Sequence, residues 1–259
     1  MNHVTHEGAA RAIVTMAQNE SVFLPIWLRY YSRFFQGDDI YVLDHESTDG
    51  STTRSGFVRI PVSHPVVDWG WHRDMLQQHQ QLLIRKYDSV LCTDVDEIVA
   101  PDPRIGNLAD YIDRFQGDFV NCRGYEILHL RDIERPLDLT RPVLDQRSHW
   151  FFNPAYSKPL LARVPMSWHG GLHSRVDGER RDDPSLYLIH LHRVDYNACL
   201  ARHRQRISRP WNQRDLDEGW GYQNRITDPE QFDRWFYQDS CSGTPVIVEP
   251  IPDFWKGVI

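Results

Sequence analysis

Apolar residues fall in short runs along the first part of the chain, and polar, turn-forming stretches separate the runs. Runs of this length rich in Val, Ile and Leu predict buried strands, and apolar positions at helical spacing predict helices that cover a sheet. Strand followed by helix, repeated along a chain, is typical of an α/β fold with a mainly parallel central sheet flanked by helices. The pattern predicts strands at 12–16, 39–44, 57–62 and 89–93, and helices at 23–35 and 75–86.

The pattern is less regular after residue 101. Residues 131–185 are rich in Arg, Pro, Trp, His and Gly, and the tail from residue 209 is polar and aromatic, so neither stretch predicts long elements. The elements that we expect here are a helix at 108–115, strands at 117–122, 160–164 and 186–191, and a basic helix at 196–207.

Composition narrows the class of protein. A chain of 259 residues with a net charge of -7 can bury one large core and does not hold nucleic acid by its overall field. No apolar run is long enough to cross a bilayer, and residues 1–8 do not read as a signal peptide. We therefore expect a soluble cytoplasmic protein, which could also act at the inner face of a membrane. The four cysteines form no C-x-x-C pair, which indicates neither a zinc motif nor a disulfide framework.

An acidic motif follows directly after the run at 89–93. Asp94, Asp96 and Glu97 would repel one another unless a cation lies among them. Ligands of open α/β sheets bind at the carboxyl ends of strands, and Asp94 and Asp96 alternate so that both can point at one ion. The motif predicts a divalent-metal site. The alternative is a strand that simply ends in solvated acids.

A second candidate is the loop that follows the strand at 39–44. Asp44 ends that strand, and a carboxylate in this position can accept hydrogen bonds from a nucleotide base or a ribose. The loop at 45–51 is rich in Ser, Thr, Asp and Gly. Its side chains could equally bond only their own backbone as turn residues.

Together, the segments 14–20, 24–28, 43–51 and 94–97 resemble the nucleotide-sugar-binding half of glycosyltransferase family 2 and its relatives, including a subgroup with an Asp-x-Asp-Glu motif. The resemblance covers roughly residues 12–101. It implies a Rossmann-like fold of the GT-A type in a single domain over 1–259. Within it, 9–125 would bind the nucleotide sugar, 126–208 would hold the acceptor and complete the metal site, and 209–259 would be a C-terminal extension.

The resemblance also implies an activity: transfer of a sugar from a nucleoside diphosphate sugar, UDP-linked, to a carbohydrate or glycoconjugate acceptor. Mn²⁺ or Mg²⁺ would bridge the diphosphate. The implied metal ligands are Asp94, Asp96, His173 and His190. The implied nucleotide contacts are Asn19, Glu20, Asp44, Glu46, Arg73, Asp94 and Lys158.

The acceptor side is less defined. An inverting transferase needs a base, usually a carboxylate, but the family's later Glu-Asp and Gln-x-x-Arg-Trp signatures are not present in that form. The candidate bases are Asp177, Asp195 and Glu126, and the candidates for sugar stacking are Trp150, Trp168, Trp211 and Trp220. A sugar-nucleotide hydrolase, a nucleotidyltransferase and a non-catalytic carbohydrate-binding protein are the alternative functions.

Overall fold

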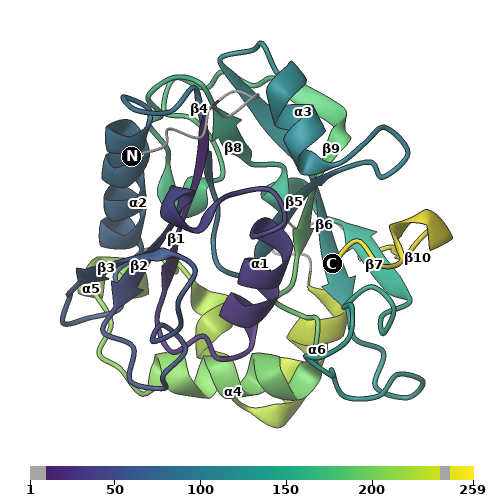
Figure 1. Ribbon diagram of the computed structural model, residues 1–259. Helices are drawn as coiled ribbons and strands as arrows, with labels where there is room; N and C mark the ends of the chain where they lie inside the picture. Colours follow the sequence, from purple (N-terminus) through teal and green to yellow (C-terminus); the bar gives the residue numbers. More distant parts are fainter. Residues whose placement is uncertain (1–9, 240–245) are drawn as a thin grey trace.

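The computed structural model describes residues 10–239 and 246–259, and Cys241 lies outside them. The described strands form one ten-stranded sheet with the main order β10-β7-β6-β8-β4-β1-β2-β3, and β9 joins β6 and β5 beside it (Figure 1). The α/β class predicted from the hydrophobic pattern is confirmed.

The first half of the chain builds the parallel part of this sheet. Its strands are β1 (Arg11–Ala17), β2 (Ile40–His45), β3 (Val58–Val62) and β4 (Ser89–Cys92), close to the predicted bounds. β1 lies between β2 and β4, and all three pairings among the four strands are parallel. Every residue of β4 is buried, as expected of a central strand covered on both faces.

The second half adds mostly antiparallel strands: β5 (Glu97–Pro101), β6 (Phe119–Leu128), β7 (His149–Phe152), β8 (Pro159–Ala162), β9 (Asp182–His190) and β10 (Val248–Pro250). β8 joins the halves, because it pairs antiparallel with both β4 and β6. β9 is parallel to β6 and antiparallel to β5. One continuous sheet therefore carries both halves of the chain.

Helices cover the sheet. Their bounds are α1 (Phe23–Tyr31), α2 (Trp69–Leu83), α3 (Leu108–Arg114), α4 (Tyr196–Ile207), α5 (Gln213–Asp217) and α6 (Pro229–Gln238). Short 3-10 turns lie at Gly37–Asp39, Pro154–Tyr156, Gly170–Leu172, Tyr222–Arg225 and Asp253–Trp255. Within the described ranges, no helix combines the length and the apolar composition that crossing a membrane requires.

Two differences from the predicted helices have local causes. α2 begins at Trp69 rather than at residue 75, because the Asp68 carboxylate caps it by accepting a hydrogen bond from the Trp71 N–H at 2.8 Å. The tail from residue 209 contains α5 and α6, which the polar composition concealed. The signal for α6 was present, since Asp228 caps the helix and Pro229 occupies its first turn.

The position of α4 defines the site. This helix, predicted at its observed bounds, crosses one end of the sheet, below the strands in Figure 1. Its Arg202 contacts Glu20, which follows β1, and Asp96, which follows β4. The carboxyl ends of the parallel strands therefore face a helix rich in arginine.

Candidate active site

A cavity of about 590 Å³ opens at the carboxyl ends of β1, β4 and β9. Its walls come from α2, from α4, and from the segments 155–158, 169–173 and 220–224. Asp94 and Asp96 both line it, as the acidic motif predicted. The strand-end position thus brings the two carboxylates to a cavity at the edge of the sheet where ligands of open α/β sheets bind.

Lys158 holds Asp94 in place. The Lys158 Nζ lies 3.1 Å from Asp94 Oδ2 and 2.6 Å from Glu97 Oε1, and the lysine and Glu97 are both fully or nearly fully buried. Burial alone would lower the pKa of Lys158, but the two carboxylates raise it above its ordinary value. Lys158 is therefore a buried cation. Glu97 belongs to β5 and serves as its counter-charge, whereas Asp94 remains open to the cavity.

Asp96 lies between an arginine and a histidine. Its Oδ2 accepts from Arg202 Nη1 and is 3.6 Å from His190 Nε2. Burial would raise the pKa of Asp96, but Arg202 and then His190 and His192 hold it well below its usual range. The group is an ionised carboxylate at neutral pH.

Glu126 orients His190. The Glu126 Oε2 lies 2.6 Å from His190 Nδ1, so that Nε2 is the ring atom turned toward Asp96. Burial lowers the pKa of His190, but Glu126 and Asp96 together raise it above the ordinary value. Glu126 is completely buried, and its other oxygen accepts from the Arg193 N–H at 3.1 Å. A metal-binding histidine usually donates its second ring N–H to a carboxylate, which orients the imidazole. Glu126 occupies this position beside His190.

The donor set fits a divalent cation. Asp96, His190 and His192 each offer one ligand atom, and these atoms lie within 4.8 Å of one another. One carboxylate oxygen with imidazole nitrogens suits Mn²⁺ better than Mg²⁺, which prefers oxygen alone. Asp94 adds a second carboxylate close enough for the charge of Asp96 to oppose its ionisation. His173 lines the same cavity, but its Nδ1 bonds the Ala155 carbonyl at 2.6 Å.

Cations gather on the α4 side of the cavity. Arg202 Nε and Nη2 lie 2.9 and 2.6 Å from Glu20 Oε1, and Arg206 Nη2 is 3.5 Å from the same atom. Burial lowers the pKa of Arg206 to about 10, with Arg202 adding to the effect. Arg206 therefore stays charged near pH 7. Arg202, Arg206 and Arg209 all line the cavity.

The remaining predicted nucleotide contacts divide into two groups. Arg73 lines the cavity, although it also pairs with Asp74 at 2.7 Å. Asn19, Asp44 and Glu46 are not among the lining residues. Asn19 instead organises the loop that follows β2, because its Oδ1 accepts from the N–H groups of residues 48 and 49.

Both carboxylate oxygens of Asp44 already accept hydrogen bonds from neighbouring residues. Its Oδ2 accepts from Arg59 Nε at 2.6 Å, and its Oδ1 accepts from the Ser47 N–H at 3.0 Å. Burial would raise its pKa, but the bonds to Ser47 and Arg59 lower it. Glu46 is exposed, has a φ of 56°, and bonds the Ser63 hydroxyl. The bond from Ser47 to Asp44 is of the turn-forming kind, whereas Arg59 and Ser63 are partners from outside the loop at 45–51.

The three predicted bases do not meet at the cavity. Asp177 is exposed and paired with Arg175. Asp195 caps α4 through the Ala198 N–H at 3.0 Å and also accepts from the Leu137 N–H. Glu126 lies behind His190. None of these three is among the residues that line the cavity.

Aromatic residues from α2 and from the segment 220–224 contribute to the wall of the cavity. Trp69, Trp71 and Trp220 line the cavity, and the Trp69 Nε1 is buried with no hydrogen-bond partner among the described residues. Gly221, with a φ of 61°, lets its loop approach Trp69, since a Cβ there would lie 2.2 Å from that nitrogen. Of the four tryptophans predicted for sugar stacking, only Trp220 lines the cavity; Trp150 and Trp168 are buried, and Trp211 bonds the Arg206 carbonyl.

Sequence reasoning missed several lining residues. His72 lies 3.7 Å from Asp94, and burial lowers its pKa, although Asp94 opposes this, so the imidazole is neutral near pH 7. His192, Arg202 and Arg206 were also missed. Arg202 and Arg206 are four residues apart in the basic helix, which puts them on one face. That spacing was a signal in the sequence.

No family model matches the chain, and no curated protein matches it. Among solved structures it is similar to the mannosyltransferase PcManGT from Pyrobaculum calidifontis in complex with GDP-Man and Mn²⁺, at 14% identity over 77% of this chain and 62% of that chain, with a TM-score of 0.42. It is also similar to the bifunctional glycosyltransferase WbbM in its apo form, at 15% identity over 49% of this chain and 24% of that chain, with a TM-score of 0.30. Both neighbours are glycosyltransferases, but with TM-scores below 0.5 neither similarity assigns a function to this chain.

Proposed function

We propose that the protein is a metal-dependent glycosyltransferase of the GT-A type that moves a sugar from a nucleoside diphosphate sugar to a carbohydrate or glycoconjugate acceptor. The observation that carries the proposal is the placement of Asp94 and Asp96 at the carboxyl end of a central strand, in one cavity with His190 and buried cations. A divalent ion with positive side chains around it is the environment that a leaving diphosphate requires.

Each part of the cavity has a role in this proposal. Asp96, His190 and His192 would hold Mn²⁺, with Asp94 beside them. The ion neutralises charge on the departing nucleoside diphosphate. Arg206 is partly buried and charged, lines the cavity and is 3.5 Å from the Glu20 carboxylate, so we favour its guanidinium as the group that binds a phosphate.

The aromatic part of the wall suits the organic parts of the ligands. Trp69, Trp71 and Trp220 offer aromatic faces for a base or a sugar ring. For the base that deprotonates the acceptor, we favour His72 over the three acids predicted from sequence. It lines the cavity and is neutral near pH 7, so it can accept a proton.

The direct test is calorimetry of the full chain with UDP- and GDP-linked hexoses, with and without Mn²⁺. We expect binding that requires Mn²⁺ and that weakens by at least about 100-fold in Asp96→Asn, because the ion loses a carboxylate. Asp118→Asn is the matched control, since Asp118 is an exposed aspartate paired with Arg181 outside the cavity. Binding that is indifferent to both Mn²⁺ and Asp96→Asn would contradict the metal-bridge proposal.

Product analysis separates transfer from hydrolysis. Release of nucleoside diphosphate in the presence of candidate acceptors should be accompanied by a glycosylated product. If every donor that binds is cleaved at a rate that no acceptor changes, and the free sugar is the only product, the enzyme is a sugar-nucleotide hydrolase. If the donors bind with Mn²⁺ but are never cleaved, the protein is a binding protein.

A further inference from the structure

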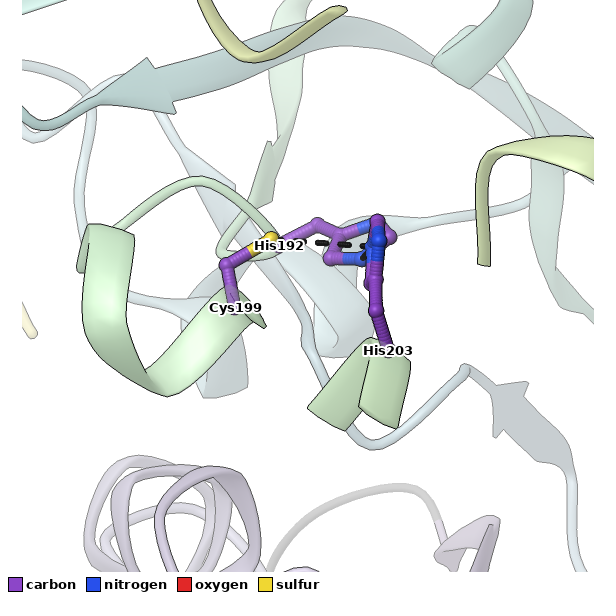
Figure 2. A group of neighbouring side chains, drawn as sticks. All are labelled: His192, Cys199 and His203. Atoms are coloured by element: carbon purple, nitrogen blue, oxygen red, sulfur yellow. Dashed lines mark hydrogen bonds between the residues drawn. The ribbon is translucent and has the colours of Figure 1, made fainter. Parts of the chain in front are cut away.

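Three side chains converge beside the cavity, and of these only His192 also belongs to the proposed Mn²⁺ site. His192 comes from the loop after β9, and Cys199 and His203 come from α4 (Figure 2). The two α4 residues are four positions apart and therefore share one helical face. All three side chains are buried, and only His192 also lines the cavity.

Two of the three separations are close to those of ligands around one small cation, and all three ligand atoms lie within 4.8 Å of one another. His192 Nε2 and His203 Nε2 are 3.0 Å apart, and Cys199 Sγ is 3.7 Å from His203 Nε2. In a tetrahedral zinc site, bond lengths of about 2.0 and 2.3 Å put two imidazole nitrogens about 3.4 Å apart and a sulfur about 3.6 Å from a nitrogen. The observed separations lie within a few tenths of an ångström of both values.

A backbone contact fixes the tautomer of His203. Its Nδ1 lies 2.9 Å from the Ile226 carbonyl oxygen, which can only accept a hydrogen bond. The Nδ1 therefore carries the proton, and Nε2 presents a lone pair to His192 and Cys199. A histidine whose far nitrogen donates to a backbone carbonyl is oriented as metal-binding histidines usually are.

We propose that His192, Cys199 and His203 bind a zinc ion that joins the loop after β9 to α4. A thiolate with two imidazoles selects a borderline-soft cation such as Zn²⁺, whereas Mn²⁺ and Mg²⁺ favour the carboxylates at Asp94 and Asp96. The ion would hold α4 in place and so keep Arg202, which lies on this helix, in contact with Asp96. The proposal does not depend on the glycosyltransferase function, because Cys199 and His203 lie outside the cavity lining and only His192 is shared with the proposed Mn²⁺ site.

The thiol state agrees with a site that closes when metal arrives. Burial raises the pKa of Cys199 well above its ordinary value, although the Arg193 guanidinium opposes this effect. The free thiol is therefore protonated near pH 7, and zinc would displace that proton. The bound thiolate would then offset one of the two charges of the ion.

The test is a cobalt titration of the full chain after its metals have been removed with a chelator. Co²⁺ is a spectroscopic substitute for zinc, and thiolate ligation gives a charge-transfer band together with the d–d absorption of tetrahedral cobalt. We expect both signals to saturate at one ion per chain and to disappear when Zn²⁺ is added. Absence of the charge-transfer band would overturn the proposal and leave a hydrogen-bonded pair of histidines.

Variants locate the ion. Cys199→Ala and His203→Asn should each lose the cobalt spectrum and weaken zinc binding by at least about 100-fold, because each removes a direct ligand. Cys122→Ala is the matched control, since Cys122 is a buried free cysteine on β6 outside the cluster. A charge-transfer band that persists in Cys199→Ala would place the metal elsewhere and refute the site. If a variant fails to fold, as judged by circular dichroism, the wild-type titration alone still decides.

Discussion

Two polar clusters share His192 but differ in charge and solvent access. The first contains Asp96 and His190, borders the cavity, and is held by the charges of Arg202 and Glu126. The second contains Cys199 and His203, lies within the protein, and consists of groups that burial keeps neutral. The comparison teaches that neighbouring sites that share one histidine can favour different cations. Ionised oxygen donors beside an open cavity suit a reacting, exchangeable cation, and buried sulfur and nitrogen donors suit a permanent one.

The largest effect should come from Lys158, the buried cation that pairs with Asp94 and Glu97. Lys158→Met removes the partner of Glu97 and Asp94 and leaves Glu97 as a buried, uncompensated carboxylate. Breaking a buried pair in this way costs about 3–5 kcal/mol, so we expect the free energy of unfolding in urea to fall by that amount.

Two variants control this experiment. Lys86→Met, at an exposed lysine, should change stability by no more than about 0.5 kcal/mol. The double variant Lys158→Met/Glu97→Gln should recover part of the loss, because it removes the uncompensated charge. An equal loss in the double variant would show that packing rather than charge explains the effect.

The next effect concerns the orientation of His190. Glu126→Gln replaces the carboxylate that bonds His190 Nδ1 and leaves most of the side-chain volume unchanged. Loss of such a supporting group typically costs 10–100-fold, so we expect the affinity for Mn²⁺, measured by calorimetry, to fall by about that factor.

Metal binding at the proposed zinc site is the control for Glu126→Gln. The thiol cluster does not contain Glu126 or His190, so the cobalt charge-transfer band should be unchanged in this variant. Simultaneous loss of both metals would instead indicate that Glu126 supports the whole region. Unchanged affinity for Mn²⁺ would remove His190 from the ligand set.

His190 should respond to pH in the opposite direction from His192 and His203. Burial lowers the pKa of His192 and His203, the latter to about 3, so the folded chain stays neutral there while the unfolded chain binds protons below about pH 6.5. These histidines stabilise the fold above that pH, and their contribution is lost as the pH falls toward the folded pKa. His190 has a raised pKa, and its contribution is present at low pH and is lost as pH rises through the folded pKa.

Urea unfolding in the presence of a chelator measures this balance. With more lowered than raised pKa values among the buried histidines of the site, including His72 and His45, stability should decrease from pH 7 toward pH 5. His203→Asn should reduce the slope by about 1 kcal/mol per pH unit, which is close to the limit for one titrating group. A slope that is unchanged in His203→Asn would show that this histidine is already protonated when folded.

Much of the fold was predictable from the sequence because it depends on local patterns. The strands β1 to β4 follow from short apolar runs, and α4 was predicted at its observed bounds. The placement of Asp94 and Asp96 was also predictable, because acids that directly follow a buried parallel strand must lie at the carboxyl edge of the sheet. Asp94 and Asp96 both reach the cavity.

The rest depends on contacts between distant segments, which no local pattern specifies. Arg202 meets Asp96 across 106 residues, and Arg59 from β3 takes Asp44 away from the cavity. The cluster of His192, Cys199 and His203 does not depend on distant segments, because its three residues lie within residues 192–203. The expectation of no zinc motif followed from the lack of a C-x-x-C pair. The Cys-x-x-x-His spacing on a predicted helix was the signal for this cluster.

The smallest effect is expected at the acids that geometry separates from the reaction. Asp177→Asn changes an exposed aspartate whose partner is Arg175, and neither metal cluster includes it. We expect the rate of donor cleavage to stay within about twofold of wild type, because surface substitutions away from a site rarely matter. His72→Gln, at the cavity, should instead reduce the rate with little change in donor affinity, since a base acts in the transition state. A large loss in Asp177→Asn with normal donor binding would return the acid to the reaction and remove His72 from it. That outcome would require the segment around Asp177 to close over the cavity during catalysis.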